Sequence, residues 1–152
     1  MDSGDAPHPR TLAQGSMTRA ARLGVSAMAA FFVFGACASG VSALTLLWPG
    51  GPLDALWQAN PIGHARLLQA GGWGVLLMAA VCVVCALTAR GLWRRRRWGH
   101  RLALGMLSVN LLGDVANAVW RDDPRTLIGI PIAGALIVFL LTPAVRRGFS
   151  GR

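Results

Sequence analysis

One carboxylate inside an apolar run is the first candidate for chemistry in this sequence. Asp114 follows Asn110 by four residues and precedes Asn117 by three. Because a helix has 3.6 residues per turn, these three side chains, here called the polar stripe, share one helix face. A carboxylate inside a membrane costs about 2.5–3.5 kcal/mol on insertion scales, so it is retained where it has a partner or a function.

The polar stripe has two interpretations. As a transport site, Asp114 would titrate and the asparagines would help to hold a proton or a cation. As a structural clamp, which the sequence favours, the stripe would join helices through hydrogen bonds. Possible partners at a similar depth are His64, Arg66, Gln69, Arg121 and the Leu127 carbonyl, whose helical hydrogen bond is removed by Pro131.

A second motif with possible chemistry is the pair Cys82 and Cys85, which has C-x-x-C spacing. Reactive pairs of this kind usually lie at a helix N-terminus, where the thiolate is stabilised. This pair lies deep in an apolar run, which disfavours the thiolate. Packing cysteines are therefore favoured over a thiol redox site, and no loop carries a cysteine for a disulfide framework.

The strongest charge signal is the arginine hinge, residues 90–101, which holds six of the fifteen arginines. Adjacent charges of this kind cannot lie in hydrocarbon, so the hinge must lie in water or among lipid headgroups. Basic clusters at the cytoplasmic face attract anionic lipids, and tryptophans anchor helix ends in the interface. The predicted anionic-lipid contacts are Trp93, Arg94, Arg95, Arg96, Arg97 and Trp98.

The composition places these motifs in a membrane protein. Of the 152 residues, 54% are apolar and only 14% are charged, compared with about 25% in soluble domains. The net charge of +9 could indicate nucleic-acid binding. The arginines lie at the ends of apolar runs, however, so membrane topology explains them better and no nucleic-acid partner is expected.

Four apolar runs are long enough to cross about 30 Å of hydrocarbon. A polar tail over residues 1–18 is predicted to be disordered, and Met17 is an alternative start. The first run could instead be a cleaved signal ending at Cys37, although it continues ten residues further, which favours a span. The predicted spans are 23–47, 65–89, 102–120 and 124–143, within a membrane domain over 19–147 that a basic tail, 148–152, follows.

The arginines also predict the orientation of the spans. Twelve of the fifteen lie on the side that holds both termini and the hinge. Because positive charge marks cytoplasmic loops, both termini and the hinge are predicted to be cytoplasmic. The predicted fold is an all-α integral membrane four-helix bundle, made of two hairpins that the hinge joins.

Several segments carry a family resemblance. They are L-D-A-L-W-Q-A-N-P at 53–61, G-L-W-R-R-R-R-W-G-H-R-L-A-L at 91–104, N-L-L-G-D-V-A-N-A at 110–118 and D-P-R-T-L-I-G-I-P-I at 123–132. With these segments, the chain resembles a group of small bacterial four-helix membrane proteins whose function is not established. The resemblance implies that fold and a bacterial inner-membrane location. It transfers no catalytic or binding residue.

The sequence therefore predicts a structural or accessory membrane protein with no catalytic residue, cofactor or metal. The scattered histidines and cysteines lack the spacing of a metal site. An oligomeric small-solute or proton-coupled transporter that uses Asp114 is the alternative, and a membrane thiol redox protein is less favoured. Expected partners are anionic lipid headgroups and either a second copy of the chain or another membrane protein.

Overall fold

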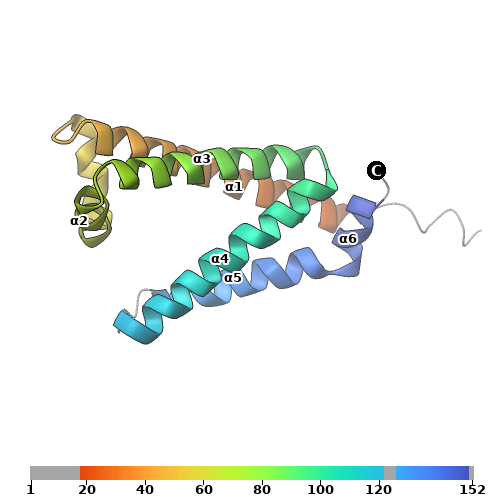
Figure 1. The fold of residues 1–152 in the computed structure, drawn as a ribbon. Coiled ribbons are helices and arrows are strands. Elements are labelled where there is room, and N and C mark those ends of the chain that lie inside the picture. Colours follow the sequence, from red (N-terminus) through yellow and green to blue (C-terminus); the bar gives the residue numbers. More distant parts are fainter. Residues whose placement is uncertain (1–17, 122–125, 151–152) are drawn as a thin grey trace, which may run out of the picture. The chain divides into compact units, whose positions relative to one another are not determined.

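The computed structural model describes residues 18–121 and 126–150. Every regular element in these two ranges is helical, which confirms the all-α prediction (Figure 1). The expected disorder of residues 1–18 falls almost wholly outside the described residues. The helices are α1 (Arg19–Leu47), η1 (Pro52–Ala59), α2 (Pro61–Gln69), α3 (Gly72–Trp93), α4 (Arg97–Arg121), α5 (Thr126–Leu141) and α6 (Pro143–Ser150).

Three of these helices, α1, α3 and α4, are long and apolar enough to cross a membrane. The bent pair formed by α5 and α6 becomes a fourth candidate if it is counted as one span. Large apolar side chains on these helices face outward: Phe34 and Val119 are each 72% exposed. Apolar faces of this extent are typical of a membrane protein, because a soluble chain would bury them.

The chain forms two compact units, Met1–Val25 with Arg95–Arg152, and Ser26–Arg94. In the unit Ser26–Arg94, α1 and α3 lie side by side, with η1 and α2 at one end (Figure 1). A Cβ atom at Gly40 would lie 3.3 Å from Cys82 Sγ, and one at Gly35 would lie 3.5 Å from Cys85 Sγ. The glycines therefore let the two helices approach closely.

Two helices cover the predicted second span, 65–89. Helix α2 ends at Gln69, and Gly71 has a φ of 56°, a left-handed conformation that glycine adopts readily. Helix α3 begins at Gly72, and Gly74 packs against the Leu67 carbonyl where a side chain would not fit. The candidate span thus runs over Gly72–Trp93 and includes the first part of the hinge.

The segment before α2 is fixed by side-chain contacts. Trp57 donates its Nε1–H to Thr45 Oγ1 at 2.8 Å, and its ring stacks on His64 with a centroid distance of 4.6 Å. Asn60 caps α2 by accepting the Gly63 N–H at 2.9 Å, and Pro61 is the first helical residue. The connection between α1 and α3 is therefore an ordered part of the unit.

In the other unit, α4 and α5 pack against each other (Figure 1). Ala103 and Leu107 on α4 are buried, as are Ala133 and Leu140 on α5. The first part of α1 joins this unit at Gly24, where any side chain would collide with the Phe139 ring.

Helix α5, which lies within the predicted fourth span, 124–143, stops at Leu141. Thr142 precedes a proline, and such a residue disfavours the helical conformation. Helix α6 therefore begins at Pro143, and α5 and α6 meet at a bend of 60°. The predicted basic tail, 148–152, is helical as far as Ser150.

Candidate functional site

Two members of the polar stripe interact on α4. Asn110 donates an Nδ2–H to Asp114 Oδ2 at 3.3 Å. Asn110 is exposed, whereas Asp114 and Asn117 are half-buried. The four-residue spacing thus joins Asn110 and Asp114 on one helix face, as the sequence predicts.

The site includes a glycine that the sequence did not predict. A Cβ atom at Gly129 of α5 would lie 2.5 Å from Asp114 Oδ2 and 3.2 Å from its Cγ. Real Cβ atoms essentially never come within 3.0 Å of a non-bonded heavy atom, so any other residue at position 129 would force the Asp114 carboxylate to move. A glycine inside a helix costs about 1 kcal/mol relative to alanine, and here the space it leaves admits Asp114. A comparison of depth along the third and fourth predicted spans places Gly129 near the level of Asp114, but it does not show that the two face each other.

The predicted contacts of Asn117 and Arg121 are the next feature of the site. Asn117 makes no side-chain hydrogen bond among the described residues. Arg121 ends α4, but its side chain lies outside the described part of the structure, as does that of Leu127. Contacts of Asp114 with Arg121 and of Asn117 with the Leu127 carbonyl therefore stay predictions.

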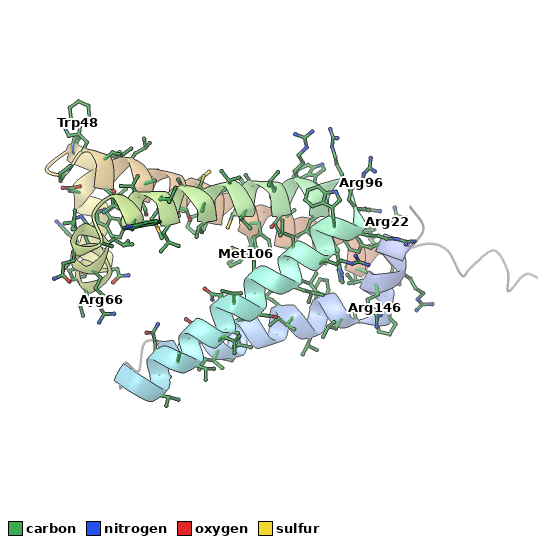
Figure 2. The ribbon with its side chains drawn as sticks, in the orientation of Figure 1. Arg22, Trp48, Arg66, Arg96, Met106 and Arg146 are labelled. Atoms are coloured by element: carbon green, nitrogen blue, oxygen red, sulfur yellow. The ribbon has the colours of Figure 1, made fainter. Side chains whose placement is uncertain are left out.

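The remaining predicted partners belong to the unit Ser26–Arg94, so their pairing with Asp114 also stays a prediction. His64 stacks on Trp57 within its own unit. Arg66 and Gln69 are exposed on α2, and Figure 2 labels Arg66 there. The contacts that the structure gives His64 are thus structural ones.

The cysteines lie where packing requires small side chains. Cys85 is buried and Cys82 is half-buried, both opposite glycines of α1, and Cys37 is exposed. All three are free thiols. Among residues 18–121 and 126–150, no three His, Cys, Asp or Glu side chains come together as metal ligands would.

The arginine hinge is mostly helical. Helix α3 ends at Trp93, and the Arg94 N–H still donates to the Arg90 carbonyl at 3.0 Å. Arg95 has a φ of 51°, an unusual conformation for a residue with a side chain. Five of the six predicted lipid-contact side chains are exposed, namely Trp93, Arg94, Arg96, Arg97 and Trp98, and Arg95 is half-buried. Figure 2 labels Arg96.

Two basic side chains complete the ends of the last helices, a role that the sequence did not predict. Pro143 has no N–H, so the Phe139 carbonyl instead accepts the Thr142 N–H at 3.1 Å and the Thr142 hydroxyl at 2.8 Å. His100 Nε2 lies 2.9 Å from the Leu140 carbonyl and must donate, because a carbonyl only accepts. Arg97 donates its Nε–H to the Phe149 carbonyl at 3.1 Å.

Comparison with models of known families, with curated proteins and with solved structures found no match for this chain. The site is therefore interpreted from its own geometry. That geometry comprises one half-buried carboxylate, one amide donor on the same helix, and a glycine on the facing helix. Such an arrangement can hold two helices together, and its carboxyl group can also bind or release a proton.

Proposed function

We propose that this chain is a structural or accessory membrane protein, without catalytic activity, whose polar stripe joins α4 to α5. One observation carries the proposal: the Asp114 carboxylate lies against the backbone of α5 at Gly129. A polar group packed in this way favours a fixed role in helix association. The hydrogen bond from Asn110 holds the carboxylate on α4, and the carboxylate in turn packs against Gly129 of α5.

The proposal includes a location and an orientation. We place the chain in a bacterial inner membrane as a four-helix bundle, with four spans and with both termini and the hinge cytoplasmic. The distribution of the arginines supports this orientation. The exposed arginines and tryptophans of the hinge would contact anionic headgroups, and the outward apolar faces would contact lipid, a second copy or another membrane protein.

A second candidate function, an oligomeric proton-coupled transporter, is favoured by one feature of the same site. Asp114 is only half-buried, and its hydrogen-bond donor Asn110 is exposed. A proton could therefore reach the carboxyl group if Asn110 faced water. This function would require Asp114 to titrate during transport.

Proton flux in reconstituted liposomes separates the two functions. We expect liposomes with the wild-type protein to carry no more proton flux than protein-free liposomes, and the Asp114→Asn variant to behave identically. The variant should stay folded, because an amide has the shape of a carboxyl group and still forms hydrogen bonds. A pH gradient read with an enclosed dye measures the flux. A wild-type flux that Asp114→Asn abolishes without loss of helicity would support transport instead.

A further inference from the structure

We propose that a groove between α1 and α3 binds one anionic phospholipid, with an acyl chain in the groove and the phosphate at Arg90 and Arg94. The proposal rests on the membrane placement given above and assigns the lipid contact to a defined site. The groove lies within the unit Ser26–Arg94 and has a volume of about 480 Å³. It is independent of the polar stripe.

The floor of the groove is apolar and is lined mainly by small side chains. Ala86 and Ala89 of α3 and Ala36 of α1 line it, and their single methyl groups leave space between the helices. Val33 and Cys37 complete the α1 side, where the thiol behaves as a small apolar group. A lining of this kind suits a hydrocarbon chain, because it offers a polar ligand few partners.

The rim of the groove is cationic. Arg90 and Arg94 are four residues apart, so they share one face of the helix end. Both are exposed, and the structure gives neither guanidinium group a partner among the described residues. Trp93 lies beside them and is 74% exposed. Guanidinium groups bind phosphate through paired hydrogen bonds, and tryptophan favours the headgroup level of a bilayer.

The length of the groove also fits a phospholipid. Ala86 and Arg94 are eight residues apart, which corresponds to about 12 Å along α3. One leaflet provides about 15 Å of hydrocarbon, half of the full core.

Two other occupants fit the groove less well. A second copy of the chain would bring its own arginines to the same depth, where like charges repel. A free phosphate ion would leave the apolar floor unused.

The test compares lipid retention by the full chain, purified in detergent, using native mass spectrometry. We expect the wild type to retain one phosphatidylglycerol in preference to phosphatidylcholine, and millimolar inorganic phosphate not to displace it. The Arg90→Gln/Arg94→Gln variant should bind phosphatidylglycerol about 30-fold more weakly. Each arginine near an anionic membrane surface contributes about 1 kcal/mol of binding free energy, which is about fivefold in affinity. The matched control is Arg19→Gln/Arg22→Gln, which removes two exposed arginines of α1 that do not line the groove and should change the affinity less than about threefold.

A second pair of variants tests the acyl site with every charge retained. Ala86→Phe fills the floor and should weaken phosphatidylglycerol binding on the order of tenfold. Val83→Phe adds a similar ring to an exposed position that does not line the groove and should have no effect.

Four results would overturn the proposal: equal losses in the two arginine double variants, no loss in Ala86→Phe, equal retention of the two lipids, or displacement by inorganic phosphate. If the chain does not lie in a membrane, it will not sediment with membranes before extraction. That result is distinguishable from all four.

Discussion

At the scale of single residues, the contact between Asp114 and Gly129 explains how a carboxylate at position 114 fits beside the facing helix. A carboxylate needs space beside the facing helix, and the space exists because position 129 has no Cβ atom. The sequence predicts the face that Asp114 occupies, since helical spacing follows from the chain alone. It does not predict the facing glycine, because the pairing depends on the rotation of α5 about its own axis.

Gly129→Ala should destabilise the protein by about 1–3 kcal/mol, because the added methyl group overlaps Asp114 Oδ2. The control is Gly134→Ala on the same helix, where a Cβ atom meets nothing within 4 Å. That control should be neutral or stabilising by up to about 1 kcal/mol. Unfolding in detergent micelles measures both variants.

A double-mutant cycle isolates the contact. In an Asp114→Ala background, Gly129→Ala should cost little, so the coupling energy should reach about 1 kcal/mol or more. Equal effects of Gly129→Ala with and without the Asp114 carboxylate would show that the two residues are not in contact.

At the scale of helices, three backbone features set boundaries that hydropathy does not reveal. Gly71 ends the segment before α3, the Thr142–Pro143 step bends α5 into α6, and Arg95 turns the chain between α3 and α4. The predicted spans 65–89 and 124–143 do not show these breaks, because an apolar run continues through a break without a change in composition. The prolines and glycines that cause two of the breaks are visible in the sequence.

The third break, at Arg95, leads to a prediction about backbone strain. A side chain in the left-handed region costs about 1–2 kcal/mol, which glycine avoids. Arg95→Gly should therefore stabilise the protein by about 1 kcal/mol, whereas Arg95→Val should destabilise it by a similar amount or more. Both variants lose the same charge, so their difference in melting temperature reports the backbone. Equal melting temperatures would contradict the assigned conformation.

Close packing of α1 and α3 gives another prediction at this scale. Gly40→Leu should cost about 1–3 kcal/mol, because its side chain would push against Cys82. Ala38→Leu, at an exposed position of the same helix, is the control and should be nearly neutral. Cys82→Ala should also be tolerated if the thiol only fills space. If Ala38→Leu lost as much stability as Gly40→Leu, the result would contradict close packing of α1 against α3 at Gly40.

At the scale of the whole molecule, composition and hydropathy predict an all-α chain with apolar helices, and the structure agrees. These properties follow from sequence because they sum over many residues. The roles of His100 and Arg97 at the ends of α5 and α6 depend on contacts 40 and 52 residues apart, so no local pattern contains them.

The central claim is that this chain spans a membrane with its arginine hinge on the cytoplasmic side, since the lipid groove and the depth of Asp114 both depend on it. The direct test uses a variant whose three cysteines are replaced by alanine, with a single new cysteine at an exposed position. In right-side-out membrane vesicles, an impermeant maleimide should label Gln58→Cys at once. It should label Arg96→Cys only after the membrane is permeabilised. Labelling of Arg96→Cys in sealed vesicles would contradict the account.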